Sequence, residues 1–160
     1  MGMNHPLQTG IAFGLTSGVI TTLGLIVGLH SGTHSRQVVI GGILTIAVAD
    51  AFSDALGIHV SEESENVHTA KEIWISTIST FVSKFLFAMT FVVPIVVFPL
   101  PIAICASVIW GMGVLALFSD RLARGQGRAP GPVVAEHVAI AAVVIAITHL
   151  LGVWISTMTD

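Results

Sequence analysis

Five long apolar segments divide this chain, and each is long enough to cross a lipid bilayer as a helix. A helix that spans the hydrocarbon core needs about 20 largely apolar residues. The sequence predicts such segments at about residues 10–30, 38–60, 73–98, 101–119 and 133–155. Only 9% of the residues are charged and 54% are hydrophobic, whereas roughly a quarter are charged in an ordinary soluble domain. We therefore expect an all-α integral membrane protein, with five transmembrane helices in a single domain over residues 1–160.

The breaks between these segments predict how the chain is oriented in the membrane. Prolines at 99 and 101 suit the first turn of a helix but not its middle, so they separate the third segment from the fourth. Basic residues follow the second and fourth segments, on the side of the N-terminus: Lys71, Arg121, Arg124 and Arg128. Only Arg36 lies in a loop on the other side. Because basic loops stay in the cytoplasm, we expect the N-terminus inside and the C-terminus outside. We expect the host membrane to be the plasma membrane of a prokaryote.

Two rows of glycine recur every four residues in the first segment, at positions 10, 14 and 18 and at positions 24, 28 and 32. This spacing lets a second backbone approach a membrane helix closely. One interpretation is packing against helices of the same chain. The other is contact between the first helices of two chains across a two-fold axis. We predict a homodimer whose first helices meet through Gly14, Gly18 or their neighbours.

Three ionisable side chains fall at bilayer depth, where charge is costly and usually marks a functional site or a buried pair. Asp50 and Asp54 are four residues apart, and two neighbouring carboxylates suit a divalent cation. Lys84 lies about 16 Å into the third segment, and Asp50 lies about 18 Å into the second, which runs the other way. We therefore expect Lys84 within salt-bridge reach of Asp50 or Asp54. Lys84 would either neutralise one carboxylate and leave Asp54 free to bind metal, or form a purely structural pair.

An acidic segment follows the second apolar run, and residues 49–72 are predicted to continue as one helix. Asp50 and Asp54 then share a face with Glu65, His68 and Glu72. Mixed carboxylate and imidazole ligands suit Fe²⁺, Mn²⁺ or Zn²⁺. We predict a metal-capture site formed by Glu65, His68 and Glu72, with Glu62 or with Glu136 of the fifth segment completing the shell. The other interpretation is a solvated helix end.

Three histidines, His30, His34 and His149, are expected toward the outer side. They are either surface polar groups or an exit site that titrates with the outside pH. Cys105 lies in an apolar run and is expected to be a buried thiol. The chain has no nucleophile–base arrangement, Gly-rich phosphate loop or Cys-pair zinc motif, and too few basic residues for nucleic acid. We therefore expect neither an enzyme nor a prosthetic group.

Four stretches of the chain resemble the vacuolar iron transporters. Residues 14–28 (GLTSGVITTLGLIVG) resemble the first span of that family, and residues 49–61 (ADAFSDALGIHVS) its second. Residues 80–94 and 136–152 are similar to its third and fifth spans. The resemblance implies a five-span dimer with the metal path between the first and second helices at the dimer axis. It also implies export of Fe²⁺ or Mn²⁺ from the cytosol, coupled to protons.

The chain departs from the family pattern at several positions. The family usually has Asp-Gly where this chain has Ser17-Gly18, and Ser-Met where it has Ser53-Asp54. It usually has Gly-Glu at the position of Gly57-Ile58, and its long cytoplasmic metal-binding helices are reduced here to residues 60–72.

Two functions from different classes follow from this pattern. The first is a homodimeric exporter of Fe²⁺ or Mn²⁺ in the lipid bilayer. Its metal ligands would be the six residues Asp50, Asp54, Glu62, Glu65, His68 and Glu72, and its transport or coupling residues Lys84, Glu136, His149 and Ser17. The alternative is a non-transporting membrane module, in which the intramembrane charges are structural pairs and the acidic helix docks a partner.

Overall fold

The computed structural model describes residues 4–159, and all secondary structure within this range is helical. The helices are α1 (Asn4–Thr33), α2 (Arg36–Glu65), α3 (Ala70–Thr90), α4 (Val92–Val97), α5 (Leu100–Gly125) and α6 (Pro130–Thr159). Because α3 and α4 together form one long segment, the described residues contain five segments long and apolar enough to cross a membrane. The predicted all-α fold with five candidate membrane spans is confirmed, and the helices extend a few residues beyond most of the predicted limits.

The acidic segment is interrupted by a turn. α2 ends at Glu65 because Asn66 takes the left-handed conformation, with φ of 52°, which stops a helix. α3 then starts at an N-cap, where Thr69 accepts a hydrogen bond from the amide of Glu72 and the Glu72 carboxylate accepts one from the amide of Thr69. This reciprocal arrangement is a capping box. The predicted continuous helix over residues 49–72 is therefore wrong.

The third span is also interrupted, at Phe91 between α3 and α4. Pro94 has no amide hydrogen for the carbonyl of Thr90, and its ring crowds that carbonyl. Trp110 of α5 donates a hydrogen bond from Nε1 to the Thr90 hydroxyl, 3.1 Å away, and so ties α5 to the break. The predicted span 73–98 is thus two helices, whereas Pro99 precedes α5 as the sequence indicates.

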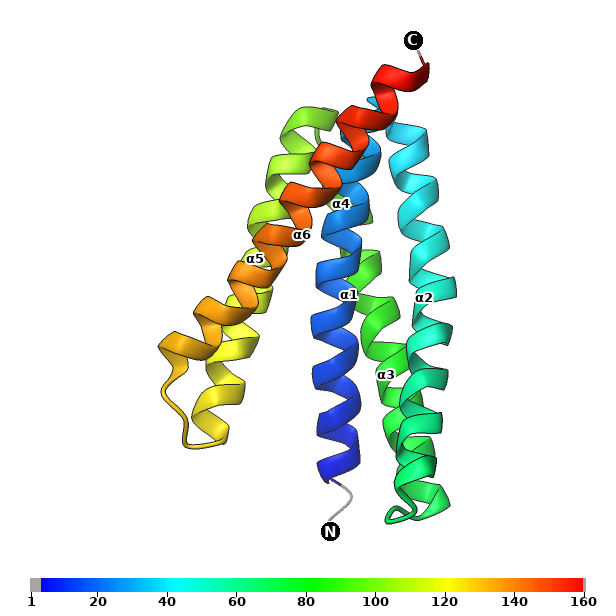
Figure 1. Ribbon diagram of the computed structural model, residues 1–160, viewed down its shortest axis with the longest axis vertical. Helices are drawn as coiled ribbons and strands as arrows, with labels where there is room; N and C mark the ends of the chain where they lie inside the picture. Colours follow the sequence, from blue (N-terminus) through cyan, green and yellow to red (C-terminus); the bar gives the residue numbers. More distant parts are fainter. Residues whose placement is uncertain (1–3, 160) are drawn as a thin grey trace.

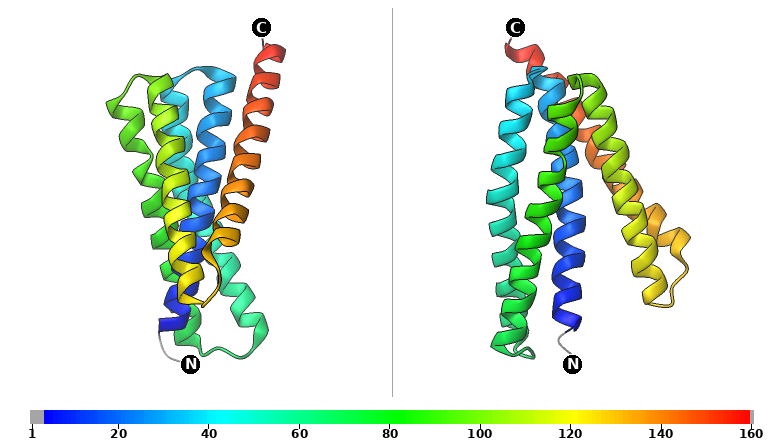
Figure 2. Two further views of the ribbon diagram at one scale, coloured as in Figure 1. Left: turned by 90° about the vertical axis from the view of Figure 1, so that its left-hand side faces the viewer. Right: turned by 180° about the vertical axis from the view of Figure 1, so that it is seen from behind.

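α1 is the central helix of the bundle. It packs against α2, α3, α5 and α6, and Figure 1 shows it between the α2–α3 pair and the α5–α6 pair. We call the end with the start of α1 and the α2–α3 and α5–α6 turns the N-terminal end, and the other the opposite end. The α5–α6 pair leans away from the other helices toward the N-terminal end, as Figure 1 and the right-hand view of Figure 2 show.

The two glycine rows of α1 explain its central position. A Cβ on Gly14 would lie 2.5 Å from the carbonyl oxygen of Thr80, so the first row packs directly on α3. A Cβ on Gly28 would lie 3.3 Å from the carbonyl oxygen of Thr148, so the second row packs on α6. A dimer contact through Gly14 and Gly18 themselves is therefore wrong, because α3 of the same chain covers them; contact through their neighbours on α1 stays a prediction. The dimer itself stays a prediction.

The outward faces of the helices are apolar. Large hydrophobic side chains are exposed along every long helix after α1, among them Phe52, Leu56, Ile78, Leu86, Ile109, Leu117 and Leu150. A soluble monomer rarely exposes so much contiguous apolar surface, so this surface fits a hydrocarbon environment. Cys105 is exposed on the same kind of surface, and its predicted burial is wrong.

Candidate functional site

The most deeply buried ion pair of the described residues joins α2 to α3. Lys84 is 1% exposed. Its ammonium lies 2.5 Å from Oδ2 of Asp50 and contacts Oδ2 of Asp54 as well. The two aspartates lie one turn apart on α2, and α3 runs back alongside α2, so both carboxylates reach the same lysine. The predicted proximity of Lys84 to Asp50 or Asp54 is confirmed, and the lysine pairs with both.

α1 completes this cluster with two hydroxyl groups. Ser17 donates a hydrogen bond to Asp54 Oδ2 (2.6 Å) and accepts one from Lys84 Nζ (2.8 Å). The Thr21 hydroxyl, one turn further along α1, lies 3.0 Å from Asp50 Oδ2 and 2.9 Å from the carbonyl oxygen of Ser17, so its single proton is shared between them. We call Ser17, Thr21, Asp50, Asp54 and Lys84 the three-helix site.

Ser17 and Thr21 differ in how the sequence pointed to them. Ser17 was a candidate because it stands where the resembled family usually has a carboxylate. Thr21 was missed, although its spacing of four residues from Ser17 matches the spacing of Asp50 and Asp54. That shared spacing was the available signal, since side chains four apart on two packed helices meet in pairs.

The three-helix site carries one net negative charge when its groups are ionised, because two carboxylates face one ammonium. The alternative in which Lys84 neutralises one carboxylate and leaves Asp54 free does not describe this structure, since both Lys84 and Ser17 bind Asp54. Gly18 makes room for the lysine. A Cβ there would lie 3.2 Å from Lys84 Cγ. The site therefore consists of a carboxylate pair with a tethered cation already in place.

A groove between α1 and α2 leads to one edge of this site. Its volume is about 560 Å³, and Asp50 is the only ionisable residue in its lining. Leu25 and Leu29 line it from α1, and the α2 residues include Thr45 and Ser53. The side chains of Asp50 and Asp54 are 27% and 20% exposed, respectively, against 2% for Lys84. The carboxylates are therefore reachable from outside the bundle, whereas the lysine is not.

The predicted capture residues at the N-terminal end occupy different surroundings. Glu62 is buried and accepts a 2.5 Å hydrogen bond from the Ser76 hydroxyl. Glu65 and His68 lie 3.5 Å apart across the end of α2. Glu72 caps α3. Because the helix stops at Glu65, the predicted single helical face through Glu65, His68 and Glu72 is wrong.

Between residues 4 and 159 the structure gathers no group of three or more His, Cys, Asp or Glu side chains that could hold a metal ion. Glu136 is exposed near the start of α6, and α6 begins on the other side of α1 from the α2–α3 turn (Figure 1). Glu136 therefore does not join the other capture residues within one chain. Metal binding by Glu62, Glu65, His68, Glu72 and Glu136 stays a prediction.

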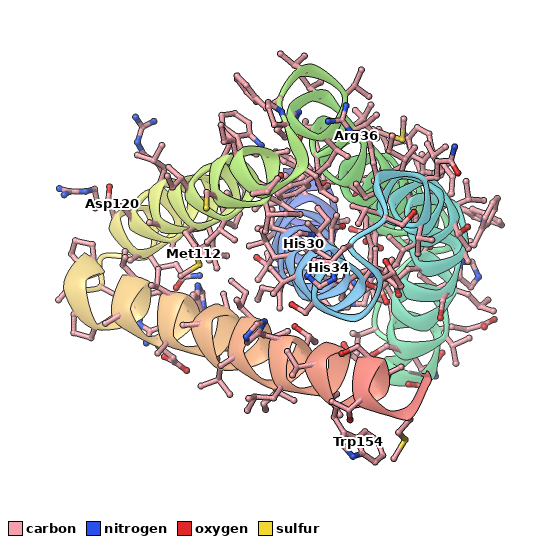
Figure 3. All side chains as sticks on the ribbon, turned by 90° about the horizontal axis from the view of Figure 1, so that it is seen from above. His30, His34, Arg36, Met112, Asp120 and Trp154 are labelled. Carbon is pink, nitrogen blue, oxygen red and sulfur yellow. The ribbon has the colours of Figure 1, made fainter. Side chains whose placement is uncertain are left out.

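The outer histidines come together at the opposite end of the bundle. The ring centres of His30 and His34 are 5.2 Å apart, and Figure 3 shows both at the end of α1 in the middle of the bundle. His149 of α6 forms a 2.7 Å hydrogen bond with Ser31, the neighbour of His30. The structure thus places all three near one another, and their role as an exit site stays a prediction.

The sequence comparisons bear on the helices that build the three-helix site. Residues 10–74 match the model of the VIT family, which confirms the resemblance over α1, α2 and the start of α3. The match covers four residues of the three-helix site and leaves Lys84 outside it. It implies transport of iron or manganese in general terms. No curated protein and no solved structure matches the chain.

Proposed function

From the VIT-family match of residues 10–74, we propose that this protein exports Fe²⁺ or Mn²⁺ from the cytosol in exchange for protons. The observation that carries the proposal is the three-helix site, where Asp50 and Asp54 hold a cation inside the membrane span. Two carboxylates and two hydroxyl oxygens are hard oxygen ligands, which suit a divalent ion such as Mn²⁺. These groups come from the helices that the family match covers.

Lys84 explains how metal and protons would be coupled. Its ammonium occupies the position between the carboxylates that a metal ion would take. A divalent ion beside two carboxylates and a charged lysine would leave a net positive charge in a buried site, which is unfavourable. With a neutral lysine, the metal-bound site has no net charge. We therefore propose that metal displaces Lys84 and that the lysine gives up one proton as it does so.

The route through the membrane follows from the proposed orientation, with the N-terminus inside. Glu62, Glu65, His68 and Glu72 would attract metal at the cytoplasmic end, and His30, His34 and His149 would line the exit. Glu136 and His149 belong to α6 and would contribute to coupling. The host membrane is proposed to be a prokaryotic plasma membrane.

A second copy of the chain would complete the path. The groove beside Asp50 is lined only by α1 and α2, and these are the helices that the family resemblance puts at the dimer axis. We propose that the homodimer forms here, in place of the glycine contact that α3 excludes.

The second candidate function is a non-transporting membrane module. One observation favours it: Lys84 already pairs with both carboxylates, as a structural ion pair would. Such a pair holds α2 and α3 in register without any ion passing.

Measuring metal flux into proteoliposomes distinguishes the transporter from the non-transporting module. We expect wild-type protein to carry Mn²⁺ and Asp54→Asn to lower the rate at least tenfold. The variant should fold, because Lys84 keeps Asp50 as a partner. Asp120→Asn is the matched control, since Asp120 pairs with Arg124 at the surface of α5. Absence of flux in the wild type, or normal flux in Asp54→Asn, would contradict the proposal.

A further inference from the structure

A second groove lies between α1 and α3, and we call it the α1–α3 groove. Its volume is about 830 Å³, and α3 supplies most of its lining, with Leu7 and Ile11 from the start of α1. None of the described residues of α5 or α6 lines it, and this pair leans away at the N-terminal end of the bundle (Figure 2, right-hand view). The α1–α3 groove is therefore open to the surrounding membrane.

The walls of the α1–α3 groove are apolar over most of its length. An exposed row on α3, with a spacing of four residues, consists of Trp74, Ile78, Val82 and Leu86. Beside it lie two buried serines, Ser79 and Ser83. Their hydroxyls already donate to the carbonyls of Ser76 and Ile11, respectively. From Ile78 to Phe87 the lining thus offers hydrocarbon and no free hydroxyl proton, which suits an acyl chain.

Lys71 stands at the N-terminal end of the α1–α3 groove and is the only ionisable residue in its lining. Its side chain is exposed and forms no ion pair with any other residue between 4 and 159. The carboxylate of the neighbouring Glu72 is engaged by Thr69 in the cap of α3. Trp74 lies about one turn further along, and tryptophan is common at the level of lipid headgroups. The groove therefore has one cationic end and an apolar remainder, the same division as an anionic phospholipid.

The length of the α1–α3 groove matches one leaflet of a bilayer. Lys71 and Phe87 are about 24 Å apart along the axis of α3, and a leaflet with its headgroups is about 20–22 Å thick. An apolar helix of a second chain would leave the Lys71 ammonium unpaired, whereas a phosphate would form a charge-assisted hydrogen bond with it. Length and charge together thus favour a lipid over a protein partner.

We propose that the α1–α3 groove binds one anionic phospholipid, whose phosphate contacts Lys71 and whose acyl chains lie along α3 as far as Phe87. A zwitterionic lipid binds less tightly, because its own cationic headgroup competes with the lysine. One lysine near an anionic headgroup corresponds to a preference of about fivefold. This inference concerns the lipid bound to the protein and stands whether or not the protein carries metal.

The test measures how phospholipids with brominated acyl chains quench Trp74 fluorescence, with phosphatidylglycerol in one set of vesicles and phosphatidylcholine in the other. The Trp74 signal is the difference between wild type and Trp74→Phe. We expect phosphatidylglycerol to bind about fivefold more tightly. Lys71→Gln should remove this preference, and Lys71→Arg should keep it. Arg128→Gln is the matched control, because Arg128 is an exposed basic residue of the α5–α6 turn at the same end of the bundle, outside the groove.

A second pair of variants identifies which groove holds the lipid, because Trp74 also borders a groove between α2 and α3. Val82→Phe narrows the α1–α3 groove, and Leu56→Phe narrows the other. We expect Val82→Phe to weaken quenching by phosphatidylglycerol at least threefold and Leu56→Phe to leave it unchanged. Both side chains are exposed, so the variants should fold.

Several results would overturn the lipid site. Equal affinity of wild type for the two lipids would do so, as would an unchanged preference in Lys71→Gln. An equal loss of preference in Arg128→Gln would also refute it, because any basic residue at this end would then have the same effect. If Val82→Phe instead lowers the mass of the protein particle in detergent, the groove is an interface between two chains and the lipid site is wrong.

Discussion

Removing Lys84 should destabilise the protein, and removing one of its aspartate partners as well should restore part of the loss. Lys84→Met keeps a side chain of similar length and removes the ammonium. Asp50 and Asp54 are then left facing each other, one helical turn apart and without a cation. Breaking a buried pair by removing one member typically costs about 3–5 kcal/mol.

The structure favours the lower end of that range. The side chains of Asp50 and Asp54 are 27% and 20% exposed, so the groove lets water reach both carboxylates once the lysine is gone. A loss of about 3 kcal/mol corresponds to a melting temperature lower by roughly 6–12 °C for a chain of this size. Asp50→Asn in the Lys84→Met background removes the repulsion and should return at least about 1 kcal/mol.

The measurement is a double-mutant cycle on protein in one detergent and lipid mixture, followed by thermal melting and by denaturant unfolding. Arg124→Met with Asp120→Asn provides the control cycle, because that pair is exposed on α5 and should show no resolvable coupling. If the losses from Lys84→Met and Asp50→Asn simply add, the two side chains do not stabilise each other and the three-helix site is incorrect.

Further predictions test the glycine packing, the helix cap, the capture residues and Ser17. Gly14→Ala should destabilise the protein by about 1–3 kcal/mol or more, since its Cβ would lie 2.5 Å from a backbone oxygen. Gly41→Ala is the control and should leave stability unchanged, because its Cβ meets open space. Equal melting temperatures of the two variants would contradict the α1–α3 contact. Thr69→Ala should cost about 1 kcal/mol by loss of the N-cap and leave Mn²⁺ flux unchanged; loss of flux with an unchanged melting temperature would point to a direct role. His68→Ala should weaken Mn²⁺ binding measured by calorimetry at neutral pH, and unchanged affinity would make the segment a solvated helix end. Ser17→Ala should reduce Mn²⁺ flux more than Thr9→Ala, which removes an exposed hydroxyl of the same helix; equal flux would exclude Ser17 from the path.

Much of the fold could be predicted because membrane helices can be identified in a sequence by their length and apolar composition. The breaks at residues 34–35 and 98–99 were visible as polar or proline-containing turns. The end of α2 at Glu65 was harder, since a helical spacing of acidic residues continues past it. The opposing signal was present in Thr69 and Glu72, whose spacing is that of a capping box. A local cap outweighed the longer periodicity, because it satisfies amide groups that the start of a helix leaves free.

By itself, the sequence determined the five spans, the match of residues 10–74 to the VIT family and the common depth of Asp50 and Lys84. These properties depend on spacing along single helices, which the chain order specifies. The tertiary structure alone decided that Lys84 meets both aspartates, that Thr21 joins them, and that the two glycine rows face α3 and α6. Such contacts depend on how each helix is rotated about its axis and which helices become its neighbours. The packing of all the spans together sets the rotation and the neighbours of each helix, and the residue pattern along one helix does not specify them.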